Sequence, residues 1–428
     1  MTAAYPMRPI DPDEFPAFYA MLEQAFNSGA PTEAEVEHDR ATFEFDRSLA
    51  AFDGSHIVGT AAALTFRLTV PGGMVAAAGV TAVAVLPSHR RRGILSGLMR
   101  RQLADIRDRG ETLAVLFASE PAIYGRYGYG MAAAELDLTI RHGEGLIPEP
   151  PAASGPPPRL RIAEPRDARA ELAKVYDAAL RERPGTPARD DRWWESSLWD
   201  PEHRRSGGSA LRCVIAEDDA GPRGYALFSV RPDWAEHGIP AGVLRVRELM
   251  ATDPAAYAAL WHDVLTRDLV AEVRARARPF DEPLQYLLAD SRRARACLTD
   301  GLWVRLVSVP GALARRRYSS AVDVVIEVSD KILPENEGRW RLQSAGPAGP
   351  AGSSARAGDG RPGATCERTS APADMALPVR ALGAAYLGGP RLSALAAAGL
   401  VTEIRPGALA ALSAALSWDP APWCPMTF

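Results

Sequence analysis

The stretch VAVLPSHRRRG, residues 83–93, decides how this chain of 428 residues can fold. It contains the end of an apolar run, GVTAVAVL, which predicts a buried strand. Pro87 ends that strand, because proline lacks the N–H group that strand pairing needs. The residues that follow have apolar side chains at helical spacing, which predicts a helix over Arg91–Asp108. A buried strand thus leads through a tight loop into a helix with a basic first turn.

This junction has the features of an anion site. Backbone N–H groups in the first turn of a helix are unpaired and carry partial positive charge, so they bind phosphate. Gly93 lets the backbone approach a pyrophosphate closely, and Arg90 and Arg91 add positive charge. The pattern is neither GxxxxGK[ST] nor GxGxxG. A solvated basic helix start is the alternative, so the junction alone does not identify a ligand.

Helices and strands alternate around the junction, and a fainter copy of the same order follows. In the second copy the strand-to-helix junction is MATDPAAYAAL, residues 250–260, which has no basic residue and no glycine. This favours a duplication that kept its chemistry in one copy, although chance similarity of common elements is the alternative. The expected helices cover residues 15–26, 91–108, 254–270, 379–387 and 391–398. The expected strands cover 48–52 and 56–70 (joined by a hairpin turn at Asp53-Gly54), 79–86, 113–118, 212–230 (with a turn at 218–222), 243–250 and 322–328.

Composition excludes several classes of protein. The length predicts two to four domains. With 49 basic and 53 acidic residues the net charge is −4, which argues against a dedicated nucleic-acid binder. Only Lys174 and Lys331 among the bases are lysines, and we attribute the excess of arginine to the codon usage of a GC-rich genome. No apolar run approaches the ~18–20 residues of a membrane helix, and the acidic, proline-containing N-terminus does not resemble a signal peptide.

The cysteines and histidines fit no metal-ligand spacing. The four cysteines are far apart and too few for a disulfide scaffold, which predicts free thiols in a reducing cytoplasm and no bound metal. Two stretches are poor in large apolar residues: a proline-rich linker at Leu146–Pro158, and a long loop at Ser344–Gly363 between two strands, GRWRLQ and ATCERT. The last residues, Trp418–Phe428, are rich in proline and aromatic side chains, so we expect this tail to dock.

A second motif follows the next predicted strand. Tyr124–Tyr129, YGRYGY, fits the Y-x-x-x-G-F/Y segment of the GNAT N-acetyltransferase superfamily. The Arg90-x-x-Gly93 spacing resembles the acyl-CoA motif of that superfamily, R/Q-x-x-G-x-G/A, at its first two positions, whereas the third position is Leu95. Two motifs in the right order and at the right distance favour an acetyltransferase. The resemblance implies that Tyr124 lies near the CoA sulfur as a general acid.

The chain also resembles the Eis (enhanced intracellular survival) family along nearly its whole length. The stretches that carry this resemblance are HRRRGIL, SEPAIYGRYGYG, GLWVRLVSVPGAL at 301–313 and YLGG at 386–389. The resemblance implies an α+β fold with a catalytic GNAT domain at 1–150, a degenerate GNAT-like domain at 151–308 and a sterol-carrier-protein-like α/β domain at 309–428. It also implies a homo-hexamer built as a dimer of trimers.

The resemblance further implies that the terminal carboxylate, here on Phe428, enters the active site. In the mechanism we expect, a neutral amine attacks the thioester of acetyl-CoA directly, and the always ionised Phe428 carboxylate accepts its proton. A backbone N–H of the Val83–Val85 strand binds the oxyanion, and Tyr124 protonates the leaving thiolate. The candidate residues are Tyr124 and Phe428 for catalysis, Val83, Ala84, Val85, Arg90, Arg91, Gly93 and Ile94 for acetyl-CoA, and Phe26 and Thr427 for the substrate.

The sequence does not identify the amine. An aminoglycoside is one candidate, but members that acetylate aminoglycosides often have an acidic residue before the last Phe, and here it is Thr427. Acidic residues near the first helix (Glu23, Glu33, Glu35, Glu37) are possible substitutes. A protein lysine, a natural-product amine or another polyamine are alternatives within the same chemistry. A non-catalytic protein that binds an apolar ligand on a GNAT scaffold is the alternative from a different class. We expect a small-molecule partner, with neither nucleic acid nor membrane.

Overall fold

The computed structural model describes residues 5–145, 157–181, 183–346 and 364–428, which form two compact units. Unit 1 consists of Met1–Ala133, Gly301–Pro422 and Thr427–Phe428, and unit 2 consists of Ala134–Asp300 and Trp423–Met426. The predicted linker at 146–158 and the predicted loop at 344–363 lie almost entirely outside the described residues. Helices that could cross a membrane, judged by length and apolar character, are missing from the described part of the chain.

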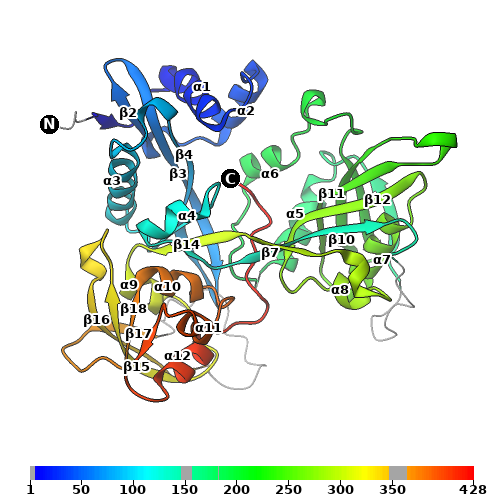
Figure 1. The fold of residues 1–428 in the computed structure, drawn as a ribbon. Helices are drawn as coiled ribbons and strands as arrows, with labels where there is room; N and C mark the ends of the chain where they lie inside the picture. The colour runs from blue at the N-terminus through cyan, green and yellow to red at the C-terminus, as the bar shows by residue number, and fades with distance from the viewer. Residues whose placement is uncertain (1–4, 146–156, 182, 347–363) are drawn as a thin grey trace. The chain divides into compact units, whose positions relative to one another are not determined.

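The first sheet of unit 1 has seven strands in the order β1-β2-β3-β4-β5-β14-β6 (Figure 1). Its elements are β1 Met7–Arg8, α1 Phe15–Phe26, α2 Glu33–Thr42, β2 Ser48–Asp53, β3 His56–Val70, β4 Gly73–Val85, α3 Ile94–Asp108, β5 Leu113–Phe117, α4 Pro121–Tyr124, β6 Gly130–Met131 and β14 Leu302–Leu306. The predicted helix at 15–26 and the predicted hairpin around Asp53-Gly54 are confirmed.

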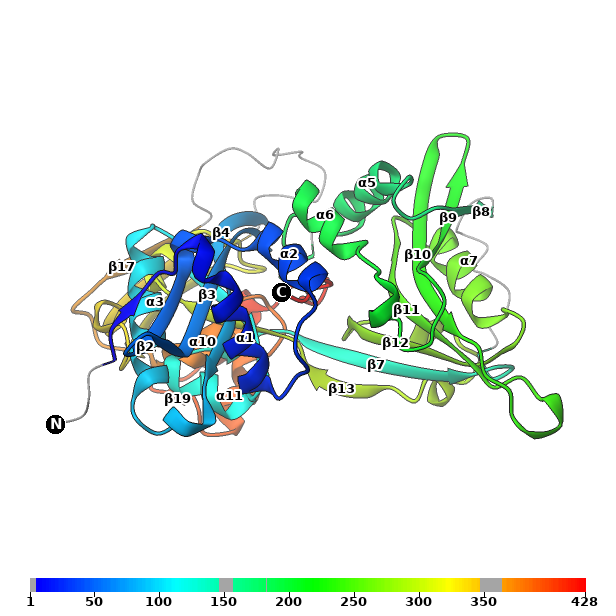
Figure 2. The same ribbon diagram turned by 90° about the horizontal axis from the view of Figure 1, so that it is seen from above.

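Side-chain alternation along β2 explains how this sheet is covered. Leu49 and Ala51 point to one face and pack with α3, whereas Ala50 and Phe52 point to the other face and pack with α1. Figure 2 shows α3 and α1 on opposite sides of β3. Both faces of the central strands are therefore buried, which explains the almost continuous apolar sequence of β3 and β4.

The two GNAT-like parts of the chain exchange strands. β14 lies between β5 and β6 in the first sheet, antiparallel to both, although it is synthesised after nearly all of unit 2. Conversely, β7, Ala134–Arg141, lies between β12, Val270–Pro279, and β13, Cys297–Asp300, in the sheet of unit 2. The expected domain limit at residue 150 therefore differs from the structural division at Ala133. The segment predicted as a proline-rich linker, 146–158, falls in the chain between β7 and β8, Arg159–Ala163, which are both strands of the unit 2 sheet.

The C-terminal domain of unit 1 contains a five-stranded sheet in the order β17-β16-β15-β18-β19. β16 and β17 pair antiparallel, which confirms the predicted hairpin on either side of the 344–363 segment. The elements are α9 Val309–Ala314, β15 Val322–Ser329, β16 Gly338–Ser344, β17 Thr365–Arg368, β18 Met375–Pro378, α10 Val379–Ala385, α11 Leu392–Ala397, β19 Thr402–Glu403 and α12 Ala408–Leu416.

Unit 2 repeats the GNAT-like order with the sheet β13-β7-β12-β11-β10-β9-β8. The helix expected over 254–270 ends at Leu265, because Leu269 takes a left-handed conformation (φ 62°) and the next strand starts at Val270. The elements are β7, β8 Arg159–Ala163, α5 Arg169–Ala179, α6 Asp191–Ser197, β9 Arg212–Asp218, β10 Gly221–Arg231, β11 Gly242–Ala251, α7 Pro254–Leu265, β12 Val270–Pro279, α8 Leu284–Leu287 and β13 Cys297–Asp300.

The C-terminal tail is ordered and docked, as its composition suggests. Trp423 is 4% exposed and joins a core cluster of unit 2 that includes Tyr176, Trp194 and Met250. Its indole N–H donates a 2.7 Å hydrogen bond to the carbonyl oxygen of Ala277. Its backbone N–H donates to the carbonyl of Pro184 at 2.9 Å, so main chain and side chain are both held.

Candidate functional site

Two parallel strands of the first sheet separate and open a cleft. β4 and β5 pair only where Ala77–Gly79 faces Leu113–Val115. Beyond Gly79, β4 continues to Val85 while β5 continues to Phe117, without further pairing between the two strands in the described residues. The peptide groups of β4 that face the gap are therefore available to a ligand.

A β-bulge shapes this edge of β4. Thr60 of β3 pairs with Ala84 and Ala62 pairs with Thr81, so Ala82 and Val83 together oppose one residue of β3. Ala82 has a positive φ of 52°, and the hydroxyl of Thr60 donates a 2.8 Å hydrogen bond to its carbonyl oxygen. Bulges of this kind re-aim the strand beside a site.

The cleft contains a pocket of about 580 Å³. Nine of the eleven candidate residues line it: Phe26, Val83, Ala84, Val85, Arg90, Arg91, Gly93, Ile94 and Tyr124. Its other lining residues are Ala25, Asn27, His89, Leu95, Ser96, Ser119, Glu120, Ile123, Arg126 and Tyr127. Thr427 and Phe428 are not among the residues that line this pocket. The structure thus brings the two sequence motifs together in one cavity.

The N-terminus of α3 forms one wall of the pocket. The helix begins at Ile94 rather than at the expected Arg91, because Arg91 (φ 61°) and the N-cap Gly93 (φ 83°) both take left-handed conformations. No side chain caps the first turn, and the space around Gly93 is open. Arg90 and Arg91 are exposed, and neither has an ion-pair partner among the described residues. This wall offers unpaired N–H groups and two free guanidinium groups, which suits a phosphate.

The corresponding helix start in unit 2 cannot offer the same site. The carboxylate of Asp253, the N-cap of α7, accepts a 3.0 Å hydrogen bond from the backbone N–H of Ala256. Asp253 also forms an ion pair with Arg223 at 2.7 Å. A resident carboxylate therefore satisfies the N–H groups and repels an incoming anion. The sequence of this junction, MATDPAAYAAL, has neither basic residues nor glycine, and in the structure its helix start likewise lacks the features of an anion site.

Tyr124 lies at the end of α4 and also lines the pocket. Its side chain is 5% exposed, and its hydroxyl hydrogen-bonds with Ser119. Burial raises the pKa of Tyr124 above its ordinary value, while the contact with Ser119 acts in the opposite direction. The phenol therefore remains protonated at neutral pH and can donate a proton. Next to it, the hydroxyls of Tyr127 and Ser96 lie 3.2 Å apart.

Phe428 lies beside the first sheet, at the end of β5. Its ring packs edge-on against Phe66 (centroids 4.8 Å apart) and Phe117 (5.4 Å). Phe117 is the last residue of β5 and precedes the pocket residue Ser119 by two positions. Thr427 is exposed and is not among the residues that line the pocket.

Several lining residues carried no separate signal in the sequence. Ser119 and Glu120 lie within the stretch SEPAIYGRYGYG, whose tyrosines drew attention first. The acidic residues considered near the first helix do not line the pocket, and the carboxylate of Glu35 instead caps α2 through Thr32. Glu120 is the carboxylate that the pocket contains. Clusters of three or more His, Cys, Asp or Glu side chains suited to a metal do not occur in the described residues.

Comparisons with known proteins cover the whole chain. The family described as "Acetyltransferase (GNAT) domain" matches residues 6–132, a second family with the same description matches 185–306, and the sterol carrier protein domain matches 309–425. The chain is 46% identical to an uncharacterized N-acetyltransferase of Streptomyces avermitilis over 99% of both chains. It is 32% identical to N-acetyltransferase Eis of Mycobacterium tuberculosis over 95% of both. The crystal structure of Eis1 from Mycobacterium abscessus is similar with a TM-score of 0.80 and 33% identity, covering 99% of this chain and 100% of that one.

Proposed function

The chain belongs to the Eis family of GNAT N-acetyltransferases, and on this premise we propose that it acetylates primary amines of a polyamine such as an aminoglycoside. The observation that carries the proposal is the single pocket that joins the uncapped start of α3 to the buried hydroxyl of Tyr124. An anion site and a proton donor in one pocket are what transfer from a phosphate-bearing thioester requires.

The residues present fit acetyl-CoA, the acetyl donor of GNAT enzymes. The pyrophosphate would be held by the N–H groups that follow Gly93 and by the unpaired guanidinium groups of Arg90 and Arg91. The unpaired edge of Val83–Val85 would bind the amide groups of the donor's arm in the way an added strand binds a sheet edge. Gly93 is required here because its left-handed φ places the first N–H groups of α3 toward the cavity.

The proposed reaction needs no covalent enzyme intermediate. The amine nitrogen bonds to the thioester carbon, the carbon–sulfur bond breaks, and the amine gives up one proton while the thiolate gains one. Tyr124 is the donor to the thiolate, and its raised pKa keeps it protonated. A backbone N–H of Val83–Val85 binds the oxyanion. The carboxylate of Phe428 accepts the proton of the amine, directly or through water.

The proposed substrate class rests on one carboxylate and one aromatic ring in the pocket lining, Glu120 and Phe26. Glu120 lines the cavity close to Tyr124, and Phe26, 47% exposed, supplies an apolar surface at the rim. A carboxylate and an aromatic ring both attract a cationic amine. We propose Phe26 and Glu120 as substrate contacts, and Thr427 as a contact that the end of the chain would supply. A protein lysine or a natural-product amine fits the same chemistry. The homo-hexamer remains a prediction that rests on the family resemblance, and the cytoplasmic location remains a prediction that rests on the sparse, unpaired cysteines.

The test measures release of free CoA thiol with acetyl-CoA and a panel of amines: aminoglycosides, linear polyamines, a lysine peptide and a monoamine. We expect release with the polycationic amines, and mass spectrometry should show one added acetyl group per thiol released. Tyr124→Phe should lower kcat by roughly 10²-fold or more. Tyr286→Phe is the matched control, because Tyr286 is 85% exposed and lies in unit 2. Release with the peptide alone would refute the polyamine substrate, and full activity of Tyr124→Phe would refute the acid role.

A further inference from the structure

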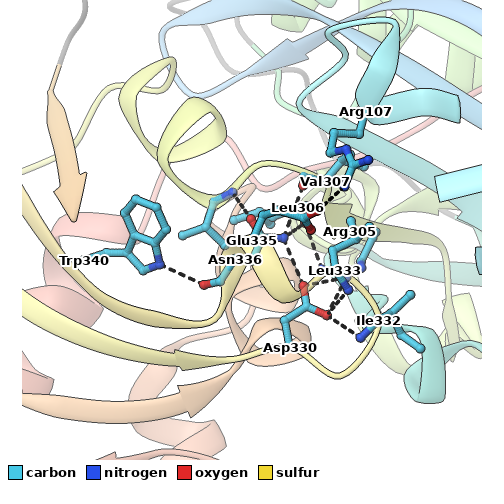
Figure 3. Close-up of polar contacts among 11 residues, drawn as sticks. Arg107, Arg305, Leu306, Val307, Asp330, Ile332, Leu333, Glu335, Asn336 and Trp340 are labelled. Carbon is cyan, nitrogen blue, oxygen red and sulfur yellow. Dashed lines mark hydrogen bonds and ion pairs between the residues drawn. The ribbon is translucent and has the colours of Figure 1, made fainter. Parts of the chain in front are cut away.

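A buried charged network connects β14 to the C-terminal domain of unit 1 (Figure 3). The guanidinium of Arg305 is fully buried and donates to both carboxylate oxygens of Asp330, at 2.8 and 2.6 Å. The side-chain amide of Asn336, 2% exposed, donates to the same carboxylate at 2.9 Å. A buried ion pair seldom stabilises a fold more than apolar residues would, so its presence suggests a requirement for defined geometry.

The C-terminal domain supplies the rigid half of this network. Oδ1 of Asp330 accepts hydrogen bonds of 3.1 Å from the backbone N–H groups of Ile332 and Leu333. Oδ1 of Asn336 accepts from the N–H of Val309 at 2.8 Å, and its amide also donates to the carbonyl of Val307 at 3.2 Å. These hydrogen bonds hold the loop after β15 in place independently of its contact with Arg305.

The other side of Arg305 faces the segment that follows Tyr124. Gly128 has a φ of 86°, and a β-carbon added there would lie 2.7 Å from Nε of Arg305 and 2.9 Å from Cγ1 of Val379, at the start of α10. The backbone of Gly128 thus packs directly on the guanidinium. Next to it, the fully buried hydroxyl of Tyr129 has no hydrogen-bond partner in the described residues, and the charge of Arg305 lies close enough to affect it.

Tyr129 in turn contacts Tyr124. Its backbone N–H donates to the carbonyl oxygen of Tyr124 at 3.3 Å, and the two rings pack edge-on with centroids 6.1 Å apart. Contacts therefore run without interruption from Asp330 through Arg305 and the Gly128–Tyr129 turn to Tyr124.

We propose that Arg305 is a positioning residue for Tyr124, and that the sterol-carrier-like domain acts as its support through Asp330. This inference rests on the proposed role of Tyr124 as the proton donor. The C-terminal domain then contributes to catalysis by holding a phenol in place, which requires no ligand of its own.

A double-mutant cycle tests the inference in the full-length protein. Asp330→Asn keeps the size of the side chain but removes the charge that orients Arg305, and we expect kcat to fall about tenfold, as misplacement of a catalytic group does. The KM for acetyl-CoA should change less than about twofold, because the start of α3 is untouched. In a Tyr124→Phe background the same substitution should lower the residual kcat less than about twofold, because the group it positions is gone.

The matched control is Asp323→Asn. Asp323 belongs to the same domain and forms an ion pair with Arg341 at 2.7 Å, but both side chains are about half exposed. Its loss should leave kcat unchanged. Should Asp330→Asn not fold, Arg305→Lys replaces it in the cycle, because that substitution keeps the positive charge but loses the planar guanidinium that donates to both carboxylate oxygens of Asp330.

The outcomes separate the two proposals. A Tyr124→Phe enzyme with full activity overturns the role of Tyr124 itself. If Tyr124→Phe loses activity but Asp330→Asn lowers kcat by the same factor in both backgrounds, Tyr124 keeps its role and the positioning by Arg305 is wrong. A tenfold loss that disappears in the Tyr124→Phe background supports the proposal.

Discussion

Replacement of Trp423 by alanine removes the ring that fixes the C-terminal tail in unit 2. Truncation of a buried Trp costs ~3–5 kcal/mol, and the carbonyl of Ala277 loses its 2.7 Å hydrogen bond, which adds about 1 kcal/mol. The guanidinium of Arg278, 5.2 Å from the ring centroid, loses a further contact. The total, ~4–6 kcal/mol, is a large part of the stability of an ordinary domain. Because Trp423 lies close to the end of the chain, we expect the tail to detach while the sheet stays folded.

Cys424 reports this detachment. Its thiol is 1% exposed, and burial raises its pKa to about 12, so it reacts with a disulfide reagent only when the tail opens. A loss of ~4–6 kcal/mol predicts labelling about 10³- to 10⁴-fold faster in Trp423→Ala under native conditions. The background from the exposed Cys297 is removed by Cys297→Ser.

Trp234→Ala is the matched control, because Trp234 lies in the same unit and is 57% exposed. Its effect on the labelling rate of Cys424 should be negligible. A rate for Trp423→Ala within threefold of the parent would refute the view that this ring anchors the tail.

Three further predictions concern the carboxylate, the anion site and pH. Three residues appended after Phe428 should lower kcat at least ~10²-fold if its carboxylate is the base, whereas the same extension at the N-terminus should not; full kcat in the C-terminal fusion would contradict that role. Gly93→Ala should raise the KM for acetyl-CoA, because a side chain disfavours the φ of 83° at this position. Gly110→Ala is the control and should leave KM unchanged, since Gly110 has a φ of 79° and equally open space but lies at the other end of α3. Equal effects of the two substitutions on KM would contradict the anion site. Burial raises the pKa of Glu135 to about 8, and the nearby Asp137 and Asp300 add to this shift. In the unfolded chain the pKa of a glutamate is ~4.3, so the unfolded state loses this proton first as pH rises. The free energy of unfolding therefore falls between pH ~4.3 and about 8, by up to ~1.4 kcal/mol per pH unit. Glu135→Gln should therefore be more stable than the parent at pH 9 but not at pH 4, as denaturation at both pH values would show; equal stability at pH 9 would refute the shift.

Much of the fold follows from local pattern. The apolar spacing of α1 and the turn at Asp53-Gly54 are local features, and both were predicted with the right positions. The three-domain α+β architecture came instead from the family resemblance, which the comparisons confirm. The start of α3 was expected at Arg91, three residues before Ile94, because side-chain pattern does not report left-handed backbone.

The candidate site was predicted less completely, for a reason of distance along the chain. Residues 83–94 and Tyr124 lie in motifs, so their meeting in one pocket could be anticipated. The ring of Phe428 is held by Phe66 and Phe117. Both belong to strands, and the alternation of side chains there predicts only that these two rings face a core. Likewise, the exchange of β7 and β14 cannot be predicted from the sequence. The alternation of side chains along each strand is the same whichever sheet the strand joins.

The place of β14 in the first sheet has a consequence for how the protein is made. On the ribosome, β14 follows β6 by about 170 residues, which at ordinary speeds of synthesis is a delay of roughly 10–30 s. During that time one edge of β5 lacks its partner, and an open strand edge is a template for pairing with other chains. The nascent chain keeps this open edge until residue 306 has emerged. A message cut short after the first domain would yield an unfinished sheet rather than a smaller enzyme.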